Sequence, residues 1–264
     1  MEPKPPTTEH TMRLAFSHDV AFGADIDGIE VPPQMDIRVQ SGVDWFDGVL
    51  GGEGFVPSQV TFFTGAPGSG KTTSMLQVCS GLAKSGATVV FNSAEESPYQ
   101  ISRASKRIRS KGWKLGTETK MPDLLEKSKR LMDRERKNDP NKPFVLVVDS
   151  INCMDDGYFD SGRITTATAE RSMEAITSWC KENWAIGLII GQVTKGGEFA
   201  GKQQIKHTVD AHAHLYIDDK KNSETFGERL FEVQKNRFGC SGKTFILGLE
   251  KKGLYEKGVI SYND

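Results

Sequence analysis

The feature that most constrains this chain is the run GAPGSGKT at residues 65–72, which fits the pattern GxxxxGK[ST] in full. A short β-branched and aromatic run, 60–64, precedes it, and residues 71–84 follow it with the apolar spacing of a helix. In a strand–loop–helix unit of this kind, successive backbone N–H groups turn inward around phosphate oxygens, and the helix N-terminus favours their negative charge. The pattern therefore predicts a loop that binds the phosphates of a nucleotide.

The residue types in and near this loop predict ATP and Mg²⁺ as cofactors. We expect the Lys71 amine to reach the β- and γ-phosphates and the Thr72 hydroxyl to hold Mg²⁺. Asp149 follows an apolar run, so its carboxylate is expected at the carboxyl edge of a strand, where it can act on the same Mg²⁺. The predicted cofactor-binding set is Gly65, Ala66, Pro67, Gly68, Ser69, Gly70, Lys71, Thr72, Thr73 and Asp149.

A second acidic position follows the strand expected at residues 88–92. Glu95 and Glu96 come just after it, and a carboxylate at the end of an adjacent strand can accept a proton from an attacking water. We expect Glu95 to be this base, with Glu96 as the alternative. Glu96 also fits a simpler role as an acidic residue in the first turn of the next helix.

The rest of the chain alternates strand and helix patterns. Strands are expected at 60–64, 88–92, 144–148 and 184–190, and helices at 71–84, 123–137 and 166–182. Another helix is expected from Ser97-Pro98 to a stop at Gly112, carrying Arg103, Lys106, Arg107, Arg109 and Lys111. Three more strand-like runs lie near 213–217, 229–234 and 244–249. The fold class predicted is α/β: a mostly parallel sheet with helices on both faces and antiparallel strands near the C-terminus.

Composition excludes several other classes. The sequence holds no run of eighteen apolar residues, and residues 1–12 have no apolar stretch typical of a secretory signal, so we expect a cytoplasmic protein with no membrane partner. The four cysteines form no CxxC pair, and His207, His212 and His214 have no cysteine nearby, which favours structural roles over a metal site. We expect residues 1–36 to be a tail, partly disordered or docked on a neighbour, and 37–264 to form the ATPase core.

Three segments of the sequence resemble the RecA-like ATPase core, and more closely its RadA (Sms) branch. The first two are SGVDWFDGVLGG at 41–52 and SAEES at 93–97, and the third is a C-terminal set made of GQVTKGGEFAG at 191–201, HTVD at 207–210 and KNRFG at 235–239. The resemblance covers roughly residues 37–256. Members of that branch carry an N-terminal four-cysteine zinc module and a C-terminal protease-like domain. Because this sequence has no cysteine before Cys79 and stops at Asp264, we expect a core-only version, of the kind that occurs in bacteriophages.

The resemblance implies a DNA-dependent ATPase that forms a ring, expected to be a hexamer, around single-stranded DNA and drives branch migration in recombination. It implies that Gln192 senses the γ-phosphate. It also implies that Lys235 and Arg237 reach the ATP of the neighbouring subunit. Alternate residues of a strand point to the same side, so these two cations can converge on one phosphate.

Two loops are candidates for DNA contact. Residues 194–207 are rich in glycine and basic, which suits contacts to a phosphate backbone, and Phe199 can stack on a base. In the acidic segment 154–168, Arg163 is the candidate contact. The predicted DNA-binding residues are Arg163, Lys195, Phe199, Lys202 and Lys206.

Three functions remain open from the sequence. The first is a motor that translocates a DNA strand. The second is a recombination accessory that binds single strands under ATP control without motor activity. The third is a RecA-like regulatory ATPase that does not bind DNA.

Overall fold

A computed structural model describes residues 23–159, 161–192, 204–239 and 243–261. Within these residues, nine strands form one sheet in the order β3-β2-β4-β5-β1-β6-β7-β8-β9. The six strands from β3 to β6 run parallel, and β7, β8 and β9 continue the sheet antiparallel. The predicted α/β fold class is confirmed.

The strands are β1 (Val60–Gly65), β2 (Thr88–Ser93), β3 (Lys114–Gly116), β4 (Phe144–Asp149), β5 (Ala185–Gln192), β6 (Ala211–Ile217), β7 (Arg229–Asn236), β8 (Lys243–Glu250) and β9 (Gly253–Ser261). The helices are α1 (Asp44–Val49), α2 (Lys71–Lys84), α3 (Pro98–Ile108), α4 (Met121–Arg136), α5 (Thr166–Glu182) and α6 (Gln204–Thr208), with short 3-10 turns at Ile26–Gly28, Pro33–Asp36 and Ile151–Cys153. No described helix is both long enough and apolar enough to cross a membrane.

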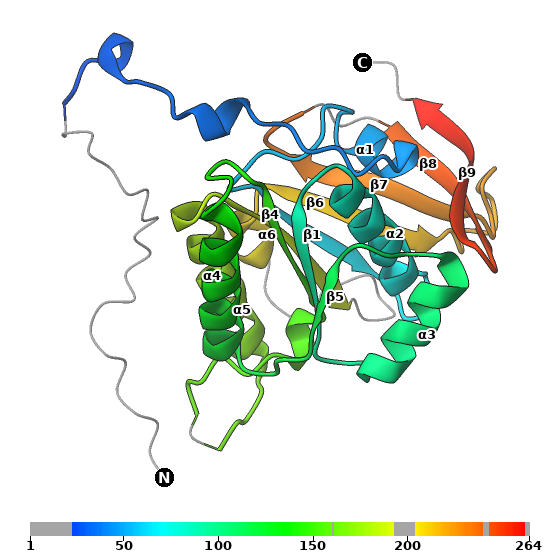
Figure 1. Cartoon of the computed structure of the whole chain (residues 1–264). Helices are drawn as coiled ribbons and strands as arrows, with labels where there is room; N and C mark the ends of the chain where they lie inside the picture. The colour runs from blue at the N-terminus through cyan, green and yellow to red at the C-terminus, as the bar shows by residue number, and fades with distance from the viewer. Residues whose placement is uncertain (1–22, 160, 193–203, 240–242, 262–264) are drawn as a thin grey trace.

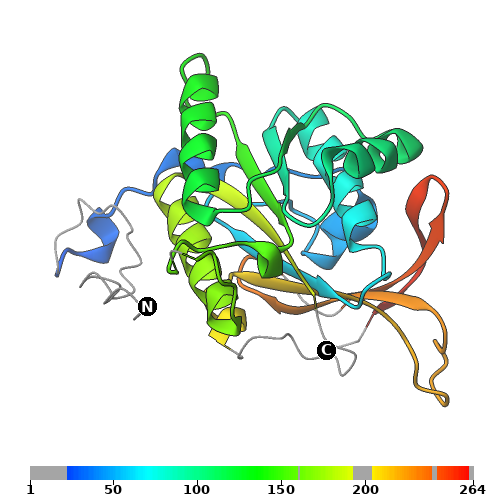
Figure 2. The ribbon, with the colours of Figure 1, turned by 90° about the horizontal axis from the view of Figure 1, so that it is seen from below.

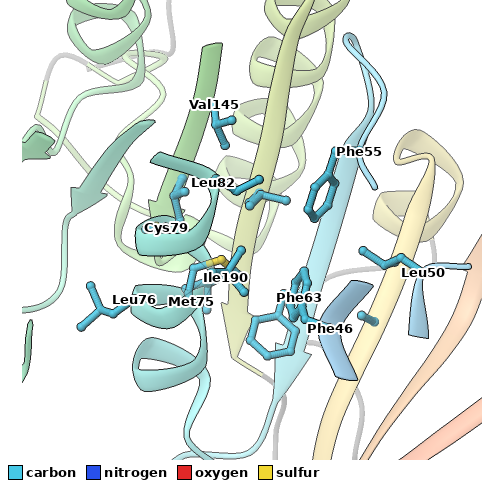
Figure 3. Close-up of a cluster of buried hydrophobic side chains, with 14 of the residues drawn as sticks. Phe46, Leu50, Phe55, Phe63, Met75, Leu76, Cys79, Leu82, Val145 and Ile190 are labelled. Carbon is cyan, nitrogen blue, oxygen red and sulfur yellow. The ribbon is translucent and has the colours of Figure 1, made fainter. Parts of the chain in front are cut away.

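The sheet lies between two layers of helices (Figures 1 and 2). Because side chains alternate along a strand, β1 sends Phe63 to one face and Phe62 to the other. Phe63 joins a core with Met75 and Leu82 of α2, shown in Figure 3. Phe62 joins a second core under α4 and α5. The central strands are buried on both faces, which places only their ends within reach of ligands.

Helix α3 begins as the sequence predicts and ends earlier. The Ser97 hydroxyl accepts from the Gln100 amide, the Gln100 side chain accepts from the Ser97 amide, and Pro98 opens the helix. The predicted stop at Gly112 is wrong: the helix ends at Ile108, and Arg109 takes the left-handed conformation, with φ 59° and ψ 30°. The Arg109 and Ser110 amides then donate to carbonyls of the last turn.

Candidate active site

The phosphate-binding loop lies where β1 meets α2. Gly70 has φ 102°, a left-handed conformation suited to glycine, and it precedes the first residue of α2. A Cβ on Gly65 would lie 2.3 Å from the Leu215 carbonyl oxygen, so the close approach of β6 requires glycine there. Among the residues that the structure describes, the buried Ser69 hydroxyl has no hydrogen-bond partner, although the Ser69 carbonyl accepts from Arg229. The loop thus depends on glycine at Gly65 for its close approach to β6 and at Gly70 for its backbone conformation.

Lys71, the first residue of α2, folds back over the loop. Its amine donates to the carbonyls of Gly65 (2.8 Å) and Ala66 (3.0 Å). Burial lowers the pKa of Lys71, while Asp149 and Glu95 act in the opposite direction. A cation held this close to the loop can transfer its hydrogen bonds to phosphate oxygens without moving far.

Thr72, in the first turn of α2, contacts Asp149, the last residue of β4. The Thr72 hydroxyl donates to Asp149 Oδ2 at 2.8 Å. Burial raises the pKa of Asp149 to about 6; the Thr72 hydrogen bond opposes this shift, and Glu95 and Glu96 add to it. The predicted meeting of a hydroxyl and a carboxylate at this edge is therefore present.

These two oxygens fit Mg²⁺. The ion prefers oxygen ligands and is usually held by one or two protein groups together with substrate phosphates and water. Among the described residues, no cluster of three or more His, Cys, Asp or Glu side chains could hold a metal by itself. A Mg²⁺ site here would therefore use Thr72 and Asp149 together with the phosphates of the nucleotide.

Glu95 and Gln192 lie near each other at the same carboxyl edge of the sheet. Gly65 and Gln192 are register partners at the ends of β1 and β5, and the Gln192 amide nitrogen lies 2.8 Å from both carboxylate oxygens of Glu95. The Asn152 side chain, which sequence reasoning missed, accepts from the Gln192 backbone amide at 3.0 Å. The expected base and the expected sensor are thus in direct contact beside the phosphate-binding loop.

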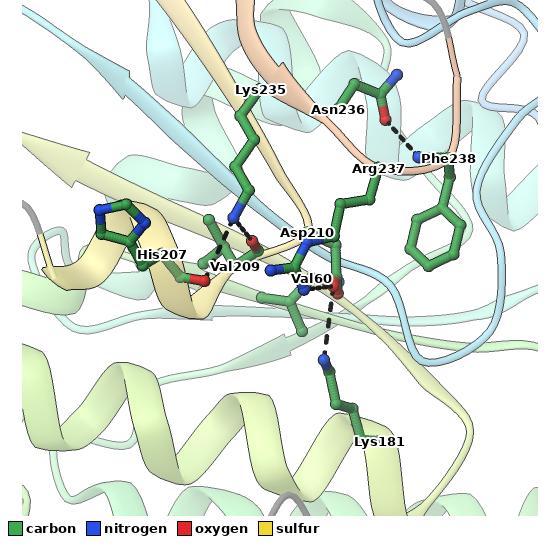
Figure 4. Close-up of polar contacts among 9 residues, drawn as sticks. All are labelled: Val60, Lys181, His207, Val209, Asp210, Lys235, Asn236, Arg237 and Phe238. Carbon is green, nitrogen blue, oxygen red and sulfur yellow. Dashed lines mark hydrogen bonds and ion pairs between the residues drawn. The ribbon is translucent and has the colours of Figure 1, made fainter.

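Lys235 and Arg237 lie together around Asp210 (Figure 4). The Lys235 amine donates to the carbonyls of Val209 (2.6 Å) and His207 (3.3 Å). The buried Asp210 carboxylate accepts from the Val60 amide and pairs with Arg237 (3.4 Å) and Lys181 (3.5 Å). The HTVD segment thus anchors the KNRFG segment, a role for Asp210 that sequence reasoning did not assign.

This basic pair lies at the far end of the sheet from the phosphate-binding loop of the same chain. Asp210 donates its amide to Val60, the first residue of β1, whereas the loop follows Gly65, the last. Five strand steps separate these residues by about 16 Å. The Arg237 side chain is about half exposed, so its outer face is open to a partner.

The predicted DNA contacts are only partly described. Arg163 is exposed on the loop ahead of α5. Lys195, Phe199 and Lys202 lie outside the described residues, and Lys206 is placed in α6 without a described side chain. In the same acidic segment, Asp156 pairs with Arg171, whose guanidinium lies 4.3 Å from the centre of the Tyr158 ring.

The two strand histidines share one hydroxyl. Thr64 Oγ1 lies 2.7 Å from His212 Nε2 and 2.8 Å from His214 Nδ1. The hydroxyl has one hydrogen, so it donates to at most one ring and accepts from the other. These contacts join β6 to β1 one residue ahead of Gly65.

Comparison with known families identifies the chain. Residues 39–253 match the family described as the KaiC ATPase. The chain belongs to this family. The match includes the phosphate-binding loop, Asp149, the Glu95–Gln192 contact and the Lys235–Arg237 pair.

Curated relatives of this KaiC-family chain are DNA repair proteins named RadA. The protein from Aquifex aeolicus is 33% identical over 83% of this chain and 46% of its own length. The protein from Haemophilus influenzae is 31% identical over 86% of this chain and, again, 46% of its own length. The chain thus spans about half the length of the curated relatives it matches.

Solved structures show the same fold at low sequence identity. A KaiC-like protein from Pyrococcus horikoshii has a TM-score of 0.66 at 18% identity, covering 84% of this chain and 99% of its own. A DnaB-like replicative helicase also has a TM-score of 0.66, at 15% identity, covering 82% of this chain and 61% of its own. These likenesses confirm a RecA-like ATPase fold.

Proposed function

We propose that this KaiC-family chain is a DNA-dependent ATPase of recombination and repair whose ATP sites lie between subunits of a ring. The observation that carries the proposal is the split of catalytic groups between the two ends of the sheet. Lys71, Thr72, Asp149, Glu95 and Gln192 gather at the carboxyl end, and Lys235 with Arg237 at the amino end. A head-to-tail arrangement of copies brings one end against the other and closes into a ring when the rotation allows.

The residues of this chain have distinct roles in the proposed reaction. Glu95 accepts the proton of the attacking water, and its contact with Gln192 fixes the direction of the carboxylate. Lys71 and the loop amides hold the phosphates, and Mg²⁺ held by Thr72 and Asp149 would neutralise part of the phosphate charge. Arg237 of the next copy stabilises the negative charge that develops on the transferred phosphoryl group.

Several observations support the DNA part of the proposal. The relatives carry the name DNA repair protein, and one structural neighbour is a replicative helicase. Gln192 is the last residue of β5, immediately ahead of the basic segment that holds Lys195 and Lys202. A change at Gln192 when ATP is hydrolysed would therefore pass directly to this segment, which would move a bound single strand.

The decisive measurement is the ATPase rate with and without single-stranded DNA, on the wild type and on Lys235→Ala. We expect a DNA-stimulated rate in the wild type and its loss in the variant, with ATP binding intact because Lys235 lies far from the phosphate-binding loop of its own chain. Lys221→Ala, an exposed lysine of the β6–β7 connection, is the matched control and should behave as wild type.

Each alternative gives a different result. A rate that single-stranded DNA does not change would contradict DNA dependence and indicate a regulatory ATPase. A DNA-stimulated rate without ATP-dependent strand displacement would indicate an accessory that binds single strands under ATP control.

A further inference from the structure

The surface of α3 and the turn that follows it is strongly basic. We call the exposed side chains of Arg103, Lys106, Arg107, Arg109 and Lys111 the α3 basic patch. From Ser97 to Thr117 the sequence has six Lys or Arg residues and neither Asp nor Glu, in a chain whose net charge is −1. This segment therefore carries a net positive charge that acidic residues of the same segment do not balance.

The cations of this patch lack the acidic partners that several other surface cations have. No ion pair is found for any of the five within the described part of the chain. Helix α4 offers the contrast: there Lys127 pairs with Glu118, Lys129 with Asp133, and Arg130 with Glu126. The α4 cations are largely neutralised by neighbours, whereas the α3 cations present their charge to solvent.

The patch has a regular geometry. Ile101 is buried against the body, and the opposite face carries Tyr99, Arg103 and Lys106 at helical spacings of four and three residues. This row spans about 10 Å along the helix, which is roughly three base-pair steps of a duplex. The Tyr99 ring is 85% exposed at the start of the row, where it can stack on a base.

Arg109 sits in a conformation that a residue with a Cβ seldom takes. Its φ of 59° is left-handed, and the position just after a helix is where glycine commonly ends it. An arginine here extends the row of charge past the end of α3 despite the backbone cost. A substitution at this position can therefore separate the effect of charge from the effect of backbone conformation, because glycine would keep the turn and remove the charge.

The chemistry of the patch favours nucleic acid over a protein partner. Protein interfaces have an apolar centre, whereas interfaces with nucleic acid are more polar and much more positively charged. On the described residues of α3, Tyr99 is the one exposed large hydrophobic side chain. The acidic segment 23–36 carries the exposed apolar residues Ile26, Ile29 and Val31 and would need an apolar groove, whereas the row on α3 is mostly charged.

We propose that the α3 basic patch is a nucleic-acid site that binds the phosphate backbone of DNA, in addition to the loop residues that the sequence predicts to contact DNA. Arg107 links this surface to the nucleotide site, since its guanidinium donates to the Lys251 carbonyl at 3.0 Å and reaches the Thr73 hydroxyl at 3.4 Å. The patch goes beyond the proposed ATPase, which does not require it.

The test measures binding of fluorescent duplex and single-stranded oligonucleotides by anisotropy, without nucleotide and over a range of salt concentrations. The patch variant combines Arg103→Gln, Lys106→Gln and Arg109→Gly. The control variant combines Lys127→Gln, Lys129→Gln and Arg130→Gln on α4, which lies on the other side of the molecule (Figure 1). Both variants remove three positive charges, so the change in net charge is the same in each.

We expect the patch variant to bind at least one of the two oligonucleotides about tenfold more weakly, with a salt slope lower by about 2 to 3 for duplex. The α4 variant should bind as wild type. The oligonucleotide that loses affinity shows whether the patch binds duplex or single-stranded DNA. Arg109→Gly alone should keep or raise the melting temperature and still weaken binding, which separates lost charge from misfolding.

Two results would overturn the proposal. One is equal affinity of the patch variant and the α4 variant for both oligonucleotides. The other is unchanged DNA binding with a changed oligomeric state in sedimentation, which would assign the patch to the acidic segment 23–36 of another copy. Because the assay needs no ATP turnover, neither result depends on the proposed ATPase, which the Lys235→Ala experiment tests by itself.

Discussion

At the scale of single residues, Asp149 makes the most specific prediction. Burial, aided by Glu95 and Glu96 and opposed by Thr72, raises the pKa of its carboxyl from 3.8 to about 6. Below that pH the carboxyl is mostly neutral and cannot help hold Mg²⁺. We therefore expect kcat/KM for ATP hydrolysis to fall as the pH drops through about 6, whereas an ordinary carboxylate would remain ionised to near pH 4.

The measurement is kcat/KM from pH 5 to pH 9 at constant Mg²⁺. Asp149→Asn should leave a low rate that does not fall further as the pH drops through about 6. Glu53→Gln, at an exposed site distant in sequence from Asp149, should keep the wild-type fall. A wild-type kcat/KM that stays constant between pH 8 and pH 5 would contradict the prediction.

Some contacts of the site could be predicted from the sequence, and others depend on the path of turns and the register of strands. The meeting of Thr72 and Asp149 could be predicted because both follow strands whose carboxyl ends share one edge. The contact of Asn152 with the Gln192 amide could not, because it depends on the path of the short turn after β4. The ion pair of Arg237 with Asp210 could not be predicted either, because it depends on the register of β6 against β1 and β7, which the sequence does not specify.

At the scale of elements, the packing of α2 against the segment before α1 gives the next prediction. A Cβ on Gly81 would lie 1.6 Å from the Ser41 carbonyl oxygen, and Ser41 is held by hydrogen bonds from its amide and hydroxyl to Asp47. Alanine is favoured over glycine inside a helix by about 1 kcal/mol, but the backbone contact forces the elements apart. We expect Gly81→Ala to lower the free energy of unfolding by about 2 kcal/mol, near the usual range for overpacking.

Urea unfolding followed by circular dichroism measures this change. Lys84→Ala, at an exposed position of the same helix, should stay within about 0.5 kcal/mol of the wild type. A higher midpoint for Gly81→Ala would show that helix propensity outweighs the contact with Ser41.

Elements with strong patterns were predictable, and those without were not. The α2 and α5 ranges were predicted at 71–84 and 166–182, and both match the structure because apolar spacing and flanking signals agree. Strands β3 and β9 were missed. β3 has three residues and little burial, and the buried residues of β9 are confined to its start at Gly253 and Leu254 among those whose burial is described, since an edge strand needs no continuous apolar run.

At the scale of the whole molecule, the two ends of the sheet predict complementation between inactive variants. Lys71→Ala removes the phosphate-binding lysine but keeps Arg237, whereas Arg237→Ala keeps the phosphate-binding loop of its own chain. In a head-to-tail ring, an Arg237→Ala subunit can hold ATP while a Lys71→Ala neighbour supplies the guanidinium. We expect each variant alone to be inactive and their equal mixture to regain up to about a quarter of the wild-type rate, since about one interface in four pairs the two intact halves.

The reason for this outcome lies in the distance along β1. Arg237 is held by Asp210 beside Val60, and about 16 Å of buried strand separates that point from the loop after Gly65. A site closed within one chain would need Arg237 to leave Asp210 and cross the sheet. ATPase rates of the two variants and of their mixture, assembled with single-stranded DNA, decide between these arrangements. A mixture as inactive as its components would place the whole site within one subunit, whereas restored activity assigns Arg237 to the ATP of its neighbour.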